Sequence, residues 1–167
     1  MRVVLSTEII PLLILIFFSV LMHELGHMIA YRAFTKNDDW KIKIGSGKPI
    51  FTIGKFTINS IFMWSGVFIP SKRVEGKAHL ILYHLGGVLM NLVAVALRYI
   101  LMFILDFTYT PFFEMILRLS VSANMWCIIL ALIPCKYPSW MGIVRGYESD
   151  GIKVYRLLKM PKKRVLR

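Results

Sequence analysis

Three long apolar runs constrain this chain more than any other feature of its sequence. They cover about residues 9–33, 79–105 and 112–134, and each exceeds the about 20 helical residues that cross the roughly 30 Å hydrocarbon core of a bilayer. Composition agrees, because 57% of the 167 residues are hydrophobic, against about 45–50% in ordinary soluble domains. We therefore expect an α-helical integral membrane protein with three transmembrane helices, folded as a single domain over residues 1–167.

The first apolar run contains three ionisable side chains near its end, in the sequence HELGH at residues 23–27. On a helix, His23 and His27 project from the same face, and two imidazoles at this spacing can bind one Zn²⁺ ion. Glu24 lies between them and is placed to act as a general base toward a water. A charge near the bilayer centre costs about 2.5–3.5 kcal/mol on insertion scales, so the pattern favours a function over two packed histidines and a stray carboxylate.

The depth of these residues can be estimated from the residues before them. The fourteen residues Ile9–Met22 precede the first histidine and cover roughly 21 Å of a core about 30 Å thick. The second run crosses in the opposite direction, which puts Gly86 and Gly87 at about the depth of His23 and Asn91 about two turns deeper. The two glycines would let another helix approach closely, and Asn91 is a candidate either for the site or for an interhelical hydrogen bond.

Residues 36–78, between the first two runs, are polar, basic and rich in turn residues. Alternating apolar and polar residues in KIKIG and PIFTIGKFTI are typical of strands, and Gly45-Ser46-Gly47 and Gly54-Lys55 are expected turns between them. We expect a small membrane-associated β-hairpin over about residues 41–68, at the membrane surface or dipping into it. An ordinary connecting loop is the alternative.

Basic residues are distributed unevenly along the chain. Nine lie from Arg32 to Lys77, nine lie in the tail 135–167, and none lies in the link 106–111. The positive-inside rule therefore predicts a multi-pass protein of the cell membrane with its N-terminus outside, its C-terminus in the cytoplasm and its active site nearer the cytoplasmic face. We assign the net charge of +12 to orientation and to anionic lipid of the bilayer, and expect no nucleic-acid partner. The run continues through the histidines without an A-x-A site, so residues 1–27 are expected to stay as a membrane helix and not to be a cleaved signal peptide.

The tail 135–167 starts irregularly and then gives the sequence SDG at residues 149–151, followed by an amphipathic helical pattern. A catalytic zinc needs three protein ligands and one open position, so the HELGH sequence requires a third ligand from elsewhere. The residues alone leave Glu148, Asp150 and His84 as alternatives. Either Ser149 or Asp150 could also simply cap the helix that follows.

At these residues the sequence resembles the site-2 protease family of intramembrane zinc metalloproteases. That family carries HExxH in a membrane helix, follows it with short membrane-associated strands and ends its first loop with a G-x-V pattern, like residues 65–67 here. Its next core helix has a G-P-x-x-N-like motif, which residues 84–91 approximate with HLGGVLMN. Its third helix reads N…N-L-x-P before L-D-G, and Asn124, Leu132-Ile133-Pro134 and SDG at 149–151 fill those places.

The resemblance covers nearly the whole chain and implies a ligand set and a mechanism. Asp150 would be the third zinc ligand beside His23 and His27. Glu24 would be the general base, and Asn91 would donate a hydrogen bond to the developing oxyanion.

The chain departs from the family pattern at three places. Gly87 stands where the family often has proline, Ala131 stands where a second asparagine is common, and the stretch from Pro134 to Asp150 is longer than usual. The strands in 41–60 are expected to capture an unwound substrate segment by edge addition.

The expected function is therefore hydrolysis of a peptide bond within or near a membrane-spanning or signal-peptide segment of a substrate protein. A regulatory membrane partner is a further hypothesis, and no residue of the sequence identifies it. The two cysteines are expected to be free thiols. Two other classes stay open. One is a catalytically inactive homologue that binds a membrane partner, against which the intact HELGH sequence argues. The other is a membrane metal or haem carrier that uses His23, His27, His79 and His84.

Overall fold

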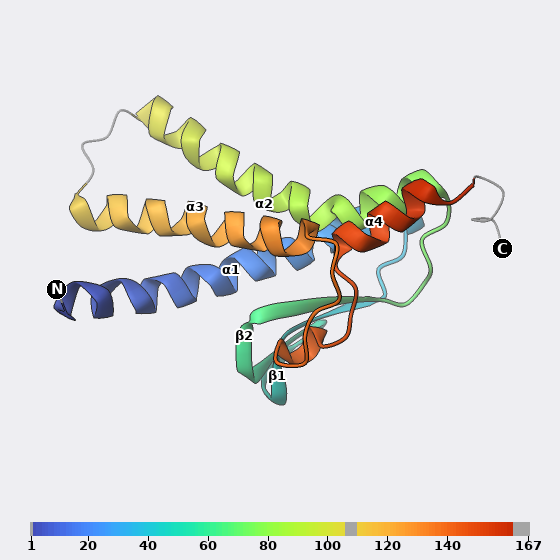
Figure 1. Cartoon of the computed structure of the whole chain (residues 1–167), viewed down its shortest axis with the longest axis horizontal. Helices are drawn as coiled ribbons and strands as arrows, with labels where there is room; N and C mark the ends of the chain where they lie inside the picture. Colours follow the sequence, from blue (N-terminus) through green and yellow to red (C-terminus); the bar gives the residue numbers. More distant parts are fainter. Residues whose placement is uncertain (1, 106–109, 162–167) are drawn as a thin grey trace.

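The computed structural model describes residues 2–105 and 110–161, in which three long helices lie beside an antiparallel sheet (Figure 1). Residue 1, the link residues 106–109 and the C-terminal residues 162–167 lie outside the described part of the chain. The elements in chain order are α1 (Arg2–Thr35), β1 (Trp40–Ile53), β2 (Phe56–Pro70), α2 (Lys77–Leu105), α3 (Pro111–Leu132), the short 3₁₀ helix η1 (Gly142–Val144) and α4 (Asp150–Lys159).

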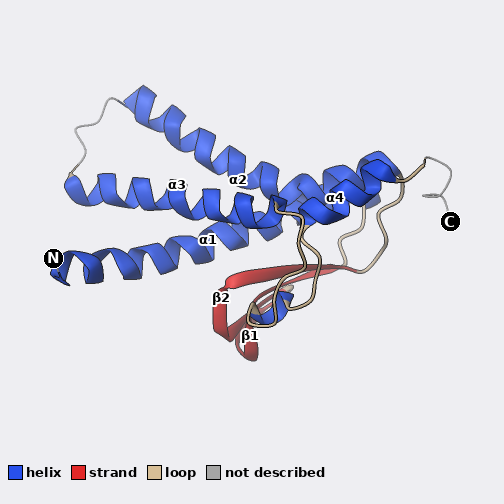
Figure 2. Cartoon of the chain, in the orientation of Figure 1, coloured by secondary structure: helices blue, strands red, loops and turns tan. Residues whose placement is uncertain are grey.

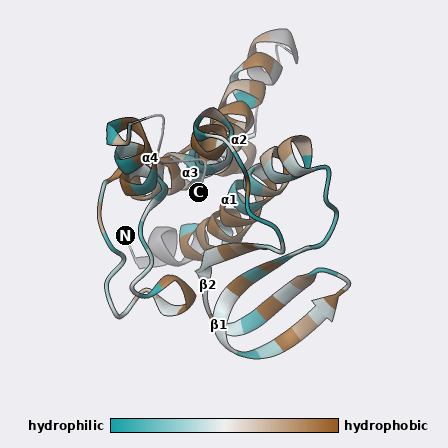
Figure 3. Ribbon diagram, turned by 90° about the vertical axis from the view of Figure 1, so that its right-hand side faces the viewer, coloured by the Kyte–Doolittle hydropathy of each residue, from teal (hydrophilic) through white to brown (hydrophobic). Residues whose placement is uncertain are grey.

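The helices α1, α2 and α3 are long and apolar enough to cross a membrane. Many of their apolar side chains are exposed, and Phe103, for example, is 89% exposed. Figure 3 shows that hydrophobic residues are frequent along these helices. Such large exposed apolar surfaces are rare on soluble proteins, because water does not solvate them favourably. The expected three spans are thus confirmed as helices of spanning length and composition.

The expected fold class, an α-helical membrane protein with only a small hairpin, is wrong. The structure has four α-helices and a sheet whose strands β1 and β2 contain 14 and 15 residues, so it is a mixed helix–strand fold (Figure 2). Ile42 pairs with Phe68 on one side and with Phe56 on the other, so three segments of the chain lie side by side there. The period-two pattern continues into the aromatic stretch before Pro70, which lengthens the strands beyond the expected hairpin.

The expected turn at Gly45-Ser46-Gly47 is a bulge inside β1. Gly45 and Gly47 have φ angles of 77° and 83°, and the pairing register with β2 shifts at this point. Glycine adopts positive φ without steric cost, so the strand bends here and continues instead of ending. The expected turn at Gly54-Lys55 does join the two strands.

The sheet and the helices meet around α1. Tyr31 on α1 packs in one buried cluster with Trp40, Ile42 and Ile44 of β1 and Phe68 of β2. This cluster fixes the sheet against the C-terminal half of α1, which is the half that carries the HELGH sequence.

The helices α1 and α2 cross at two glycines. A Cβ on Gly26 would lie 2.2 Å from the carbonyl oxygen of Gly86, and one on Gly86 would lie 2.6 Å from the carbonyl oxygen of Gly26. Only glycine permits this approach, so the small-residue contact expected at Gly86 is present.

Residues 135–149, which we call the strap, leave the end of α3, reach the sheet and return to the start of α4 (Figure 1). Its two arms are joined by backbone hydrogen bonds from Tyr137 N to Tyr147 O and from Gly146 N to Tyr137 O, each 2.9 Å long. Its tip, η1, packs on β1 and β2. The strap therefore connects the helices to the sheet on the side of α1 where the histidines lie.

Candidate metal centre

The site begins with two histidines on α1. His23 and His27 lie one helical turn apart, are 9% and 6% exposed, and their Nε2 atoms are 3.2 Å from one another. The helix continues through them without a break, so its periodicity alone brings both rings to one face.

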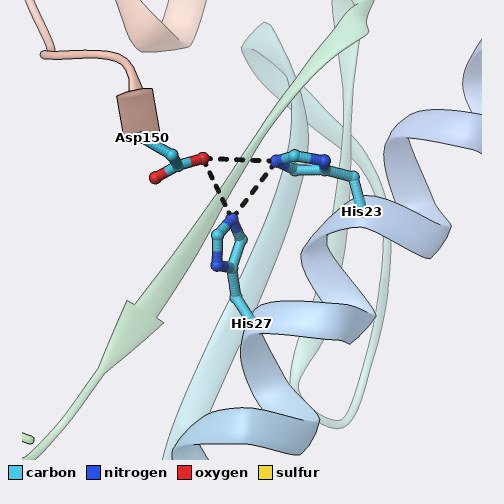
Figure 4. Close-up of side chains that lie close together, drawn as sticks. All are labelled: His23, His27 and Asp150. Carbon is cyan, nitrogen blue, oxygen red and sulfur yellow. Dashed lines mark hydrogen bonds and ion pairs between the residues drawn. The ribbon is translucent and has the colours of Figure 1, made fainter. Parts of the chain in front are cut away.

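Asp150, the first residue of α4, completes a group of three (Figure 4). Its Oδ2 atom lies 3.4 Å from His23 Nε2 and 3.3 Å from His27 Nε2. The three donor atoms come from residues up to 127 positions apart in the sequence, and all lie within 4.8 Å of one another. The structure thus brings together the three residues that were expected to be ligands.

The triangle of donor atoms has the dimensions of one face of a zinc tetrahedron. In a tetrahedron the edge is about 1.63 times the bond length, so bonds of about 2.0–2.1 Å require donors about 3.3–3.4 Å apart. The observed edges of 3.2, 3.3 and 3.4 Å fit this requirement. Two neutral imidazoles and one carboxylate are also a donor set that zinc accepts in catalytic sites, where a fourth position stays open.

Each histidine ring is held by α2. His27 Nδ1 donates a hydrogen bond to the carbonyl oxygen of Tyr83 at 2.8 Å, which leaves the lone pair of Nε2 directed at the donor triangle. His23 lies against Gly87, where a Cβ would be 2.5 Å from ring atoms Cε1 and Nε2. The second helix therefore orients both rings.

Glu24 is 6% exposed and lies between the histidines and β2. Its side chain lies against Gly66, where a Cβ would be 2.8 Å from Cγ and 2.9 Å from Oε1 of Glu24. The sheet thus holds this carboxylate beside the donor triangle, because strand β2 has no side chain at residue 66.

Asp150 is held in place by the hydrogen bonds of its neighbour Ser149, at the point where both ends of the strap meet. We call these hydrogen bonds the clasp. Ser149 Oγ donates to the carbonyl oxygen of Ile133 at 2.6 Å and accepts from Cys135 N and Ile152 N, each at 3.3 Å. The bond from Ile152 is the N-cap of α4. This one buried hydroxyl therefore joins the end of α3 to the start of the helix that carries Asp150.

The charge of Asp150 is also fixed by its surroundings. Burial raises the pKa of its carboxyl, but the charge that His27 can carry and the nearby imidazoles of His23 and His84 outweigh burial and hold the pKa well below its usual range. The carboxylate is therefore ionised at neutral pH, as a metal ligand must be.

A cavity of about 130 Å³ lies over this group. Its walls are His23, Glu24, His27 and Asp150, residues 64–68 of β2, strap residues that include Tyr137, Met141, Val144, Tyr147 and Glu148, and residues of α2 and α3 that include His84 and Cys127. We call this space the cleft. The group of acidic and imidazole side chains thus faces a space between the strap and the sheet.

The other candidate residues lie apart from the donor triangle. Asn91 is fully buried and donates its Nδ2 to the carbonyl oxygen of Ser19 at 3.4 Å, and it does not line the cleft. Its oxyanion role stays a prediction. Glu148 accepts hydrogen bonds of 2.6 and 2.7 Å from Arg156, and His79 stacks on Phe34 with ring centroids 4.5 Å apart.

Ser149 caps α4, as one of the two caps expected from the sequence, and Gly66 belongs to the G-x-V pattern of the resemblance. The contact of Gly66 with Glu24 and the hydrogen bond to the Tyr83 carbonyl were not predicted, because contacts between distant segments have no local signal in the sequence. Cys127 and Cys135 are free thiols, as expected.

No family of known proteins, no curated protein and no solved structure matches this chain.

Proposed function

We propose that this chain is a zinc-dependent endopeptidase embedded in the membrane, similar to the site-2 protease family. The observation that carries the proposal is the triangle formed by Nε2 of His23, Nε2 of His27 and Oδ2 of Asp150, with edges of 3.2–3.4 Å. It lies on a helix that is long and apolar enough to cross a membrane, beside the buried carboxylate of Glu24.

Glu24 is the general base and later the general acid. A Zn²⁺ ion bound by His23, His27 and Asp150 would supply Lewis-acid activation of the attacking water and of the substrate carbonyl. Glu24 accepts a proton from that water while the oxygen of the water bonds to the carbonyl carbon of the peptide. Glu24 then delivers the proton to the amide nitrogen as the carbon–nitrogen bond breaks.

The proposed substrate is an extended, apolar segment of a membrane-spanning or signal peptide. The cleft is lined by apolar side chains of β2 and the strap, such as Val67, Met141 and Val144. A helical substrate hides its amide groups in its own hydrogen bonds, so the segment must unwind before Glu24 reaches it. Strand β2 passes Glu24 at Gly66 and is the element next to which the unwound backbone would lie.

The proposed orientation has the N-terminus outside and the C-terminus in the cytoplasm of a cell-membrane protein. It is supported by the basic residues, of which nine lie from Arg32 to Lys77, nine in 135–167 and none in 106–111. The active site would then open nearer the cytoplasmic face.

The experiment that tests the proposed function compares wild type with the Glu24→Gln variant. Each is co-expressed with a panel of signal peptides and single-span segments that carry a tag at both ends, and zinc content is measured on the purified proteins. We expect wild type to cleave members of the panel, and Glu24→Gln to cleave none of them while it binds as much zinc. Equal cleavage by the two proteins would contradict the mechanism.

A further inference from the structure

The two carboxylate oxygens of Asp150 face different groups. Oδ2 faces the donor triangle, 3.4 Å from His23 Nε2 and 3.3 Å from His27 Nε2. Oδ1 lies 3.5 Å from His84 Nδ1 and 3.4 Å from Lys153 Nζ. The carboxylate is thus contacted by four nitrogen atoms, two at each oxygen.

The two groups that face Oδ1 come from different elements. His84 lies on α2, and Lys153 lies one turn after Asp150 on α4. The side chains of His84 and Asp150 are only 16% and 11% exposed, so water competes little for their contact. The donor group that lies within 4.8 Å is His23, His27 and Asp150, without His84. His84 is therefore placed behind the carboxylate and not beside the other ligands.

We propose that His84 and Lys153 are positioning residues that keep Asp150 a ligand through one oxygen only. A catalytic zinc site needs an open fourth position, and a carboxylate that turned both oxygens to the ion would fill it. The hydrogen bond from Lys153 and the contact of His84 Nδ1 hold Oδ1 away from the triangle and fix the plane of the carboxylate. Such outer contacts to ligands typically change metal affinity or activity by about 10–100-fold.

This inference rests on the metal site of the proposed function, and metal binding tests it without any substrate. The full chain is purified in detergent as wild type, His84→Leu and Lys153→Met. Zinc affinity is measured by competition with a chelator, and the visible absorption of the Co²⁺-loaded protein reports the coordination number. We expect each substitution to raise the zinc dissociation constant, by about tenfold or more for His84→Leu. We also expect each to shift the Co²⁺ spectrum from a four-coordinate toward a five-coordinate form.

The chain offers a matched control for each variant. His79→Leu removes a histidine of the same helix that stacks on Phe34, and Lys159→Met removes a lysine of α4 whose Nζ lies 4.4 Å from the Tyr155 ring centroid. Both are expected to keep wild-type values. His84→Asn keeps an N–H donor near the position of Nδ1 and should restore most of the affinity and the spectrum, which a loss of packing alone would not explain.

Wild-type affinity and spectrum in His84→Leu would overturn the proposal. If His84→Leu does not fold, Lys153→Met carries the test at a side chain that is 36% exposed, and unchanged values there would overturn it equally. Wild type that binds zinc without cleaving any substrate would contradict the peptidase and leave this inference standing. Wild type without zinc affinity would contradict both.

Discussion

The ring of His23 lies against the backbone of Gly87, so that a Cβ at residue 87 would be 2.5 Å from Cε1 and Nε2 of the ring. The two histidines are therefore held in different ways. His27 is fixed by its hydrogen bond to the Tyr83 carbonyl oxygen, whereas His23 Nδ1 is buried without a hydrogen-bond partner among the described residues. The orientation of His23 thus depends on packing, and on the absence of a side chain at Gly87.

The Gly87→Ala variant is expected to bind zinc at least tenfold more weakly than wild type. Its methyl group occupies the space of the His23 ring, and atoms cannot approach within about 3 Å without moving, so Nε2 leaves the donor triangle. Chelator competition on purified protein measures the effect. Ala96→Val adds methyl groups on the exposed surface of the same helix and is expected to bind zinc as wild type does. Equal zinc affinity in Gly87→Ala and Ala96→Val would show that Gly87 does not determine the orientation of the His23 ring.

The Gly66→Ala variant is expected to lose most of its peptidase activity and keep its zinc. A methyl group at residue 66 would lie 2.8 Å from Cγ and 2.9 Å from Oε1 of Glu24, so the carboxylate must move, while none of the three atoms nearest to this position belongs to His23, His27 or Asp150. Cleavage rate and zinc content are measured together, with Ser60→Ala on the exposed surface of β2 as control. Full activity in Gly66→Ala would contradict the placement of the general base against the strand.

The Ser149→Ala variant is expected to be less stable by about 1 kcal/mol, the typical cost of losing an N-cap. It also removes the bond from Ser149 Oγ to the Ile133 carbonyl oxygen, so Asp150 is held less firmly and zinc affinity should fall. Thermal unfolding with and without zinc measures both effects. Ser139→Ala, on the exposed part of the strap, should change neither stability nor zinc affinity. A Ser149→Ala variant with the same stability and zinc affinity as Ser139→Ala would show that the clasp does not hold Asp150.

The proposed orientation predicts the result of reporter fusions. A reporter joined after Arg167 should report the cytoplasm, and one inserted in the link 106–111 should report the exterior. The reason is that the tail 135–167 contains nine basic residues and the link contains none. A cytoplasmic report from the link would contradict the orientation and would place the cleft nearer the other membrane face.

The local part of the site could be predicted from the sequence, because a helix converts spacing into geometry. His23 and His27 are four residues apart, so any α-helix puts them on one face, whatever packs around it. The three apolar helices follow in the same way from run length. Asp150 needed the resemblance as well as the residues, since no periodicity links it to a histidine 127 positions away.

The supporting contacts could not be predicted, because they depend on how separate elements meet. The division of the Asp150 oxygens between the triangle and His84 follows from the docking of α4 beside α2. That docking in turn needs Gly151, where a Cβ would lie 2.0 Å from the carbonyl oxygen of Leu132. The extent of the sheet was underestimated for a related reason. Glycines at 45 and 47 are turn residues in sequence patterns, but here their positive φ angles bend a strand that stays paired.

Zinc content per chain tests the central claim most directly, because every step of the proposed chemistry requires the three ligands. Wild type and the Asp150→Ala, His27→Ala and Glu148→Ala variants are purified in detergent and subjected to metal analysis. We expect a single zinc in wild type and in Glu148→Ala, whose carboxylate pairs with Arg156, and little zinc in Asp150→Ala or His27→Ala. Full zinc in Asp150→Ala, or its loss in Glu148→Ala, would contradict the ligand set.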